Sequence, residues 1–391
     1  MNEPIIRIAA RGDGVTASGR HVPFGVPGDA LLDDGALAFG PHHQEPPCRH
    51  FPECGGCQLQ HADDEAFRLY LISRIETALA QHGLKTEIRP PHLSPPNSRR
   101  RATLKSVKVG QSALLGFNAE MSHRIVDMRE CHILHRELFE LVDPLRELLA
   151  NLLTPRRAAE IQLTLINRGV DVLLKGIFAG RLTEIEQLTS FAIKHDLARL
   201  SVDRALGPEA LFEPQPASVT LSGVPVGFPP GTFLQATEDG ETELIYCVQE
   251  VVGGFRNIAD LFSGLGTFAL ATSASYAAEA SRDVSAALKR AAPAVSIDHR
   301  DLYRRPLEPS ELKRFDAVIL DPPRAGAAEQ VAQLAKAKIA RVAYVSCNPA
   351  TFARDAKTLV EGGYVLGWVK PVGQFRWSTH VELAACFTHG G

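Results

Sequence analysis

The stretch "NIADLFSGLGTFAL", residues 257–270, decides the fold class of this chain. An apolar run that reads as a strand ends in a glycine-rich turn, and a helical pattern follows directly. Gly264, Gly266 and Ala269 match the G-x-G-x-x-G/A pattern, in which glycines let a cofactor approach the backbone at a helix N-terminus. Enzymes that use NAD, FAD or S-adenosylmethionine share this arrangement of strand, glycine turn and helix. The motif therefore predicts a nucleotide-type cofactor and leaves its identity open.

The chain after about residue 219 alternates strand-length and helix-length segments. The candidate strands are "RNIADLF", "SYAAEAS", "VSIDHRD", "FDAVILDPP" and "RVAYVSC". This alternation is typical of a parallel, doubly wound sheet with helices on both faces. We therefore predict an α/β protein in which residues 219–391 form a Rossmann-like catalytic domain.

The first half of the chain has a different organisation. Residues 1–45 are rich in glycine, with turn signals between short apolar alternations, which indicates a small β-meander or partial barrel. Residues 46–218 mix strand and helix patterns and predict a central α+β domain. Within it, residues 62–83 have an acidic start, helical periodicity and a terminal glycine, and this helix could pack on the catalytic domain.

The composition is that of an ordinary globular protein. The 391 residues are 45% hydrophobic and 22% charged, with a formal net charge of −3. This charge does not indicate a nucleic-acid binder, although a local basic patch would suffice for one. No apolar run reaches the length of a membrane span, and the N-terminus lacks the layout of a secretory signal. We expect a cytoplasmic monomer that needs no obligate protein partner.

Three of the seven cysteines are clustered. Cys48, Cys54 and Cys57 form a C-x5-C-x2-C pattern, and Cys131 is a candidate fourth ligand. The short spacing allows two thiolates to reach one metal centre. The set suits a [4Fe–4S] cluster or a zinc site with four cysteines equally well, and His50 or His61 could replace one cysteine in the zinc site. The alternative is a group of unliganded thiols in a reducing cytosol.

Several polar residues follow the predicted strands of the catalytic domain. In a doubly wound sheet, ligands bind beyond the carboxyl ends of the strands. Glu279 at the end of the second strand could hold ribose hydroxyls, and Asp301 after the third could reach an adenine amine. The residues that this reasoning places on one sheet edge are Asp260, Glu279, Asp301, Asp321 and Cys347. Each could instead form a salt bridge, a helix cap or part of the core.

Cys347 and Glu382 are the candidates for chemistry. Cys347 ends an apolar strand and precedes Asn-Pro, so it is either a nucleophile at the rim or a small packing residue. Glu382 alternates with apolar residues on the same predicted strand face as His380. Partial desolvation would raise the pKa of its carboxyl and suit a general base, whereas the alternative is a strand-edge glutamate in solvent.

Five segments taken together resemble the S-adenosylmethionine-dependent RNA uracil-5-methyltransferases. They are "CGGCQLQH", "DLFSGLGTF", "LDPPRAG", "SCNP" and "HVE", in this order. The resemblance runs from about residue 5 to residue 387 and implies a methyltransferase fold for the C-terminal domain. It also implies that residues 1–45 are a shortened TRAM domain, which is a small RNA-binding barrel of the OB type.

The resemblance implies a role for each motif residue. Cys347 would be the nucleophile and Glu382 the general base. A [4Fe–4S] cluster would be bound by Cys48, Cys54, Cys57 and Cys131. S-adenosylmethionine would be contacted by Gln235, Phe262, Glu279 and Asp321, in addition to the glycine loop.

The chemistry of uracil explains why a thiol is needed. Carbon 5 is too weak a nucleophile to take a methyl group unaided. Addition of a thiolate to carbon 6 turns the ring into an enolate whose carbon 5 is nucleophilic, and a base must then remove the carbon 5 proton to expel the thiolate. The free thiol needs local help to ionise, from Arg324 or a helix N-terminus. The target base must be flipped out of a stem or lie in a loop.

RNA contacts are expected along "NSRRRATLKSVKVG", because arginines bind phosphates and stack on unpaired bases. The candidates are Arg99, Arg100, Arg101, Lys105 and Lys108, together with Arg324 beside the Asp-Pro-Pro rim. The alternative is a solvated basic strand edge.

The chain departs from the family pattern in two places. Thr267 stands where the family more often has asparagine, and Gly373, Arg376 and Ser378 replace its usual aspartate, proline and threonine. The cysteine cluster favours 23S ribosomal RNA as substrate, with a tRNA uridine as the alternative. A nicotinamide-dependent oxidoreductase would leave Cys347 unexplained, and a non-catalytic iron–sulfur RNA-binding protein is the other alternative.

Overall fold

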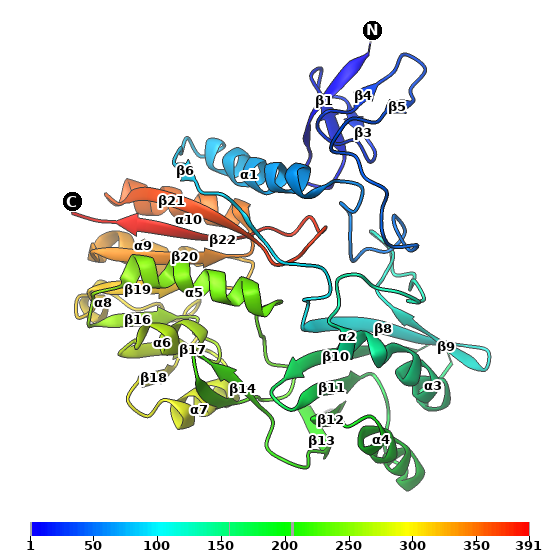
Figure 1. The fold of residues 1–391 in the computed structure, drawn as a ribbon. Helices are drawn as coiled ribbons and strands as arrows, with labels where there is room; N and C mark the ends of the chain where they lie inside the picture. Colours follow the sequence, from blue (N-terminus) through cyan, green and yellow to red (C-terminus); the bar gives the residue numbers. More distant parts are fainter. Residues whose placement is uncertain (1, 156, 205–206, 391) are drawn as a thin grey trace.

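The computed structural model describes residues 2–155, 157–204 and 207–390. These residues contain sheets of nine, six, five and two strands, which Figure 1 shows in the colours of the chain. No helix among them is long and apolar enough to span a membrane.

The nine-stranded sheet forms the core of the C-terminal region. Its order is β18-β17-β16-β19-β20-β22-β21-β6, with β7 also paired to β21. Strands such as β19 are apolar at every position because both faces of the sheet are covered. The seven C-terminal strands are β16 (Ile258–Leu261), β17 (Tyr276–Glu279), β18 (Ser296–His299), β19 (Ala317–Leu320), β20 (Arg341–Ser346), β21 (Val365–Gly373) and β22 (Glu382–Thr388).

The parallel sheet predicted from five strands is confirmed for those strands, and a later strand departs from it. Strands β16 to β20 are parallel, but β22 runs antiparallel to both β20 and β21. The connection from β21 to β22 is the short loop 374–381, which has no room for the crossover helix that a parallel pair requires. His380 therefore lies in this loop, and only Glu382 belongs to the strand.

Helices cover both faces of this sheet. Alternate residues of β19 divide between the faces: Ala317 and Ile319 pack with α5 (Glu238–Val252), α6 (Thr267–Thr272) and α7 (Arg282–Ala291). Val318 and Leu320 pack with the helices on the other face. Those helices are α1 (Asp64–Ala80), α8 (Pro309–Leu312), α9 (Ala328–Ala337) and α10 (Pro349–Glu361).

The central region has its own sheet and core. Six strands in the order β13-β12-β11-β10-β8-β9 pack with α2 (Arg136–Glu140), α3 (Val142–Leu152) and α4 (Leu182–Lys194). A separate hairpin pairs β14 (Ser218–Leu221) with β15 (Val224–Gly227). The six strands are β8 (Arg101–Val109), β9 (Ser112–Gly116), β10 (Ala158–Ile166), β11 (Gly169–Lys175), β12 (Arg199–Arg204) and β13 (Gly207–Phe212).

Elements from before residue 219 reach the C-terminal sheet. Helix α1 contacts α10 and lies over the sheet in Figure 1. Strands β6 (Glu87–Ile88) and β7 (His92–Leu93) extend the sheet beyond β21. The segment between the clustered cysteines and β8 therefore packs on the C-terminal sheet before the chain enters the central sheet.

The N-terminal residues form a small antiparallel sheet. Its order is β3-β2-β1-β4-β5, and its core contains Ile5, Val22 and Leu31 with Leu37 against it. The small β segment predicted here is present, but β1 lies between β2 and β4, so the strands do not follow each other in chain order as in a simple meander. Its strands are β1 (Glu3–Ile8), β2 (Gly14–Thr16), β3 (His21–Val22), β4 (Ala30–Leu31) and β5 (Leu37–Ala38).

Candidate active site and cysteine cavity

The glycine loop joins β16 to α6 and contains two left-handed glycines. Gly264 has φ 53° and Gly266 has φ 89°. A Cβ on Gly266 would meet Leu288 of α7 at 2.5 Å, so a larger residue there would push α7 away. The N–H of Gly264 donates to Oε2 of Glu279 at 3.1 Å. Glu279 thus lies beside the loop, as the sequence placed it.

Phe262 and Asp301 both contact Tyr303, a residue that the sequence did not single out. Phe262 has φ 64°, and its ring lies 5.5 Å from the ring of Tyr303. The N–H of Tyr303 donates to Oδ1 of Asp301 at 3.0 Å, and its hydroxyl donates to the carbonyl of Gly326 at 2.9 Å. Tyr303 therefore ties the turn after β18 to the rim loop after β19, beside the glycine loop.

Asp321 ends β19 and connects to a buried pair of glutamines. Burial raises the pKa of the Asp321 carboxyl to about 7. Gln235 donates from Nε2 to Oδ2 of Asp321 at 3.4 Å, and Gln374 donates from Nε2 to Oε1 of Gln235 at 2.9 Å. The Oε1 atom of Gln374 accepts from the N–H of Ala236 at 2.8 Å. The segment before α5 is thereby fixed against the loop before β22.

Cys347 follows β20 at the N-terminal end of α10. Its thiol is half-buried. Burial and the nearby carboxyls of Glu382 and Asp321 raise the pKa of this thiol to about 11, and Arg324 acts in the opposite direction. Asn348 caps α10 by accepting the N–H of Ala350 at 3.1 Å. The thiol therefore lies at the carboxyl edge of the sheet, within electrostatic reach of two carboxyls and a guanidinium.

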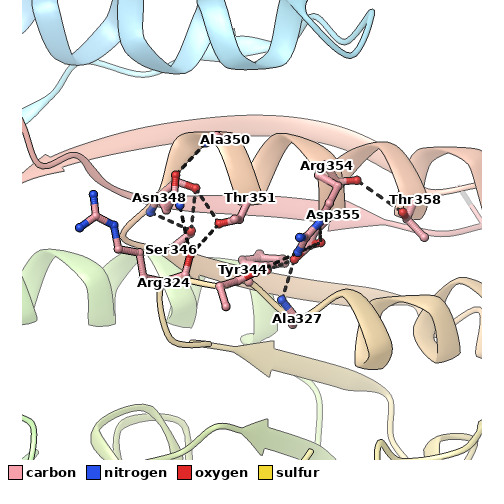
Figure 2. A network of polar contacts seen from close by, with 12 residues as sticks. Arg324, Ala327, Tyr344, Ser346, Asn348, Ala350, Thr351, Arg354, Asp355 and Thr358 are labelled. Atoms are coloured by element: carbon pink, nitrogen blue, oxygen red, sulfur yellow. Dashed lines mark hydrogen bonds and ion pairs between the residues drawn. The ribbon is translucent and has the colours of Figure 1, made fainter. Parts of the chain in front are cut away.

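A polar network around α10 holds the rim loop, as Figure 2 shows. The carbonyl of Arg324 accepts from Nδ2 of Asn348 at 3.1 Å and from the hydroxyl of Thr351 at 3.2 Å. Buried Asp355 accepts from the hydroxyl of Tyr344 at 2.6 Å and from the N–H of Ala327 at 2.7 Å. The guanidinium of Arg324 points away from this network (Figure 2) and is exposed.

Glu382 is the first residue of β22 and is only 4% exposed. Burial and the nearby charge of Asp321 raise the pKa of its carboxyl, whereas Gln374 and Arg101 lower it. The net result is a pKa of about 8. The alternative of a glutamate in solvent is wrong. A buried carboxyl beside a thiol, with a pKa near neutrality, has the properties of a general acid or base.

The four clustered cysteines line one cavity. The loop that carries Cys54 and Cys57 is tight, because a Cβ on Gly55 would meet the carbonyl of Asn118 at 2.8 Å. Phe117, Met128 and Ile133 contribute apolar walls to the same cavity. Arg99 lies near enough to lower the pKa of the Cys57 and Cys131 thiols, although burial raises both, Cys57 to about 12. The prediction that Cys131 joins the three clustered cysteines matches this geometry.

The two histidines of the alternative metal site have different surroundings. His50 lines the cysteine cavity, and its Nε2 accepts the N–H of Arg129 at 2.9 Å. His61 is buried among Phe24, Phe51 and His43, and burial lowers its pKa to about 4. Among the described residues, no three His, Cys, Asp or Glu side chains converge closely enough to hold a single metal ion.

The basic segment divides into paired and unpaired cations. Arg100 is buried and donates from Nη2 to Glu241 at 2.7 Å, so it has no face left for RNA. Lys105 pairs with Glu160 at 2.6 Å. Arg99 and Arg101 form no ion pair within the described residues, and Arg101 lies near Glu382 and Cys347. Sequence spacing alone could not tell these residues apart, since the distinction depends on partners from distant elements.

Comparisons with known proteins agree with these motifs. The family model described as tRNA (Uracil-5-)-methyltransferase matches residues 294–389. An uncharacterized RNA methyltransferase of Zymomonas mobilis is 52% identical to this chain, over 98% of the chain and 99% of that protein. The 23S rRNA (uracil(1939)-C(5))-methyltransferase RlmD of Photorhabdus laumondii is 29% identical, over 90% of the chain and 84% of that protein.

A solved structure has the same fold. The tRNA (uracil-54, C5)-methyltransferase of Pyrococcus abyssi, in complex with S-adenosyl-L-homocysteine, aligns with a TM-score of 0.76 and 23% sequence identity. The alignment covers 99% of this chain and 99% of that one. This likeness confirms the fold. The full-length relatives, the family model and the matching motifs confirm the predicted family: the chain belongs to the S-adenosylmethionine-dependent RNA uracil-5-methyltransferases.

Proposed function

We propose that this enzyme methylates carbon 5 of a uridine in 23S ribosomal RNA, with Cys347 as nucleophile and Glu382 as general base. The observation that carries the proposal is the buried carboxyl of Glu382, within electrostatic reach of the Cys347 thiol and of Asp321 at one sheet edge. A solvent-exposed glutamate or a distant thiol would not support a covalent addition that must later be reversed.

The proposed cofactor site fits the residues along the same edge. The loop after β16 contains Phe262, Gly264 and Gly266, and Glu279 and Asp301 lie next to it. Asp321 and Gln235 lie between that loop and Glu382. Buried Asp260 holds α6 by accepting the N–H of Ala269 at 2.8 Å. S-adenosylmethionine bound there would supply a methyl group as an electrophile next to the uracil ring.

The chain's own residues would divide the proton movements. The Cys347 thiol must lose its proton before it adds to carbon 6 of uracil, and the Arg324 guanidinium favours the thiolate. After methyl transfer, the ionised Glu382 carboxylate would take the proton from carbon 5, so that the carbon–sulfur bond breaks and Cys347 is released. Gln374 and Arg101 favour the ionised form of Glu382 and so keep it able to act as a base.

The reaction is tested by transfer of labelled methyl groups from S-adenosylmethionine to purified RNA. We expect the wild-type protein to produce 5-methyluridine, and Cys347→Ala to produce none. Cys247→Ala serves as the control, because Cys247 is a buried cysteine of α5 outside the site. Undiminished methylation by Cys347→Ala would overturn the proposed mechanism.

The choice of RNA rests on the relatives and is tested separately. Similarity to the 23S rRNA enzyme of Photorhabdus laumondii supports 23S rRNA as the substrate. The family model and the Pyrococcus abyssi structure carry the names of tRNA enzymes and support the alternative. Transcripts of 23S rRNA and of tRNA offered in equal amounts would decide between them. We expect label in the ribosomal transcript, and label in tRNA alone would contradict the substrate proposal.

We further propose that Cys48, Cys54, Cys57 and Cys131 hold a [4Fe–4S] cluster. The support is that four thiols line one largely apolar cavity and that Arg99 favours thiolates there. Anaerobically purified protein should contain about four iron and four sulfide per chain, which fall together in Cys57→Ser. One zinc per chain without iron would identify the alternative site with cysteine ligands.

The N-terminal sheet completes the proposed functional assignment. We infer that residues 2–45 act as a shortened RNA-binding barrel of the OB type, which a five-stranded antiparallel sheet with a small core could form. The boundaries after residues 45 and 218, the cytoplasmic location and the monomeric state stay predictions. Analytical ultracentrifugation would test the last of these.

A further inference from the structure

A cavity of about 430 Å³ lies where the central and C-terminal regions meet. Its volume falls within the range of about 300–1,000 Å³ that is usual for ligand sites. Strands β8 and β10 line one side, and the loops around Phe233 and His380 line the others. We name it the Arg101–Phe233 groove, and the residues used in the argument are Arg99, Arg101, Phe117, Phe233 and His380.

The described side chains that line the groove include two arginines and no carboxylate. Arg99 and Arg101 pair with no carboxylate in the part of the chain that the structure describes, and Nε of Arg101 is buried without a hydrogen-bond partner. Burial lowers the pKa of Arg101 to about 10, which still leaves it charged at neutral pH. His380 also lines the groove, and burial together with the charges of nearby Arg324 and Arg99 lowers its pKa. An anion is therefore the natural occupant.

Two phenylalanine rings lie beside the two arginine side chains of the groove. The guanidinium of Arg101 lies 4.3 Å from the ring centre of Phe233, and that of Arg99 lies 5.9 Å from the ring centre of Phe117. Phe233 is 57% exposed even though Arg101 covers it. An exposed aromatic ring next to an unpaired guanidinium is the arrangement by which proteins stack unpaired bases and hold their phosphates.

The groove lies next to the proposed catalytic residues Glu382 and Cys347. The charge of Arg101 acts on the carboxyl of Glu382 and on the thiol of Cys347. His380 lines the groove and is two residues from Glu382. A nucleotide in the groove would thus be a direct neighbour, along the strand, of a uridine whose ring reaches Cys347.

We propose that the Arg101–Phe233 groove binds the unpaired nucleotide adjacent to the target uridine, with its base stacked on Phe233 and its phosphate held by Arg101 and Arg99. This inference rests on the proposed function, because it takes RNA as the ligand. It adds a second base-binding site, which would hold the strand open so that the target uridine stays outside a stem.

The test is a binding measurement that needs no methyl transfer. Fluorescence anisotropy would give the affinity of the full-length protein for a labelled single-stranded RNA with a central uridine. Two further RNAs would lack the base on one or the other side of that uridine. The proteins compared are wild type, Phe233→Leu, Phe233→Trp, Arg101→Lys and the control Phe178→Leu, which alters an 80% exposed phenylalanine elsewhere.

The expected result is a base-dependent loss. Phe233→Leu should weaken binding of the intact RNA by roughly ten- to a hundredfold, as expected for loss of one base–aromatic stack. It should cause no further loss with the RNA that lacks the base on one side. Phe233→Trp should bind like wild type, because it keeps an aromatic face. Arg101→Lys should weaken binding, because ammonium offers no plane for stacking, and Phe178→Leu should change nothing.

Two results would overturn the inference. One is equal affinity of wild type for all three RNAs, which would mean that no neighbouring base is bound. The other is an equal effect of Phe233→Leu on all three, which would give Phe233 a role in backbone binding or folding. Since methyl transfer is measured separately, an enzyme that methylates RNA but gives either result would retain the proposed function and lose the groove.

Discussion

Glu382 shows how the fold gives an ordinary side chain an unusual property. It begins β22 in a position that packing against β20 and β21 keeps from solvent. Burial opposes ionisation, while Gln374 and Arg101 supply enough compensation to leave the pKa of its carboxyl at about 8. A carboxyl of ordinary pKa would be a much weaker base, since its conjugate acid would readily release the proton.

Activity should depend on the protonation of Glu382. The base must be ionised, so the methylation rate at saturating RNA should rise with pH through about 8 and fall below it. Glu382→Gln should lower turnover by about 10²–10⁴-fold and accumulate RNA bound covalently to Cys347. Only the pH dependence that comes from ionisation of the Cys347 thiol should remain. A rate that declines as pH rises from 6 to 8 would argue against Glu382 as the base.

Gln374 should tune that base. Its amide contacts Gln235, the N–H of Ala236 and Glu382, and it is 2% exposed. Because Gln374 lowers the pKa of Glu382, Gln374→Leu should move the rise of the rate to higher pH and cost about 1–3 kcal/mol of stability.

The matched control for this prediction is Gln249→Leu. The amide of Gln249 donates to the backbone carbonyl of Ala271 at 2.7 Å, on the exposed side of α5 and away from Glu382. The Gln249→Leu variant should leave the pH profile of the methylation rate unchanged. An unshifted profile for Gln374→Leu would limit Gln374 to a structural role.

At the scale of elements, the loop 374–381 joins the cysteine cavity to the catalytic strand. The N–H groups of Gln58 and Leu59 donate to the carbonyl of Trp377 at 2.8 and 2.9 Å. Trp377 also packs with Cys57. The segment that carries the cysteines therefore holds the loop that delivers Gln374 and leads into Glu382.

Loss of the cysteine site should impair catalysis through this loop. We expect Cys57→Ser to lower the methylation rate while the affinity for S-adenosylmethionine, measured by calorimetry, stays near that of wild type. The glycine loop and Phe262 are remote in sequence from the cysteines and pack on the other strands. Cys247→Ser, another buried thiol, should retain its rate, and equal losses in both variants would point to general destabilisation.

The turn between β16 and α6 should tolerate no side chain at Gly266. Gly266→Ala would combine a left-handed backbone with a Cβ only 2.5 Å from Leu288. Gly254→Ala has the same backbone strain, at φ 87°, but meets no atom within 4 Å. The difference in unfolding free energy by urea denaturation should be about 1–3 kcal/mol. Equal costs would show that α7 moves aside freely.

For the whole molecule, the sequence predicted local motifs far better than the contacts between them. The glycine loop, the rim prolines and the cysteine that follows β20 are each encoded in contiguous residues, and all lie at the expected sheet edge. The antiparallel direction of β22 and the pairing of Arg100 with Glu241 depend on residues far apart in the chain. The same is true of Gln374 and Phe233, whose neighbours come from several elements.

The attack of Cys347 on the uracil ring can be trapped with a fluorinated substrate. RNA carrying 5-fluorouridine is incubated with the protein and S-adenosylmethionine, digested, and examined by mass spectrometry. Fluorine cannot leave as a proton, so Glu382 cannot complete the reaction. We predict that the digest contains a peptide in which Cys347 carries a methylated fluorouridine. A modified peptide containing any other cysteine, or methylated fluorouridine released without an adduct, would contradict it.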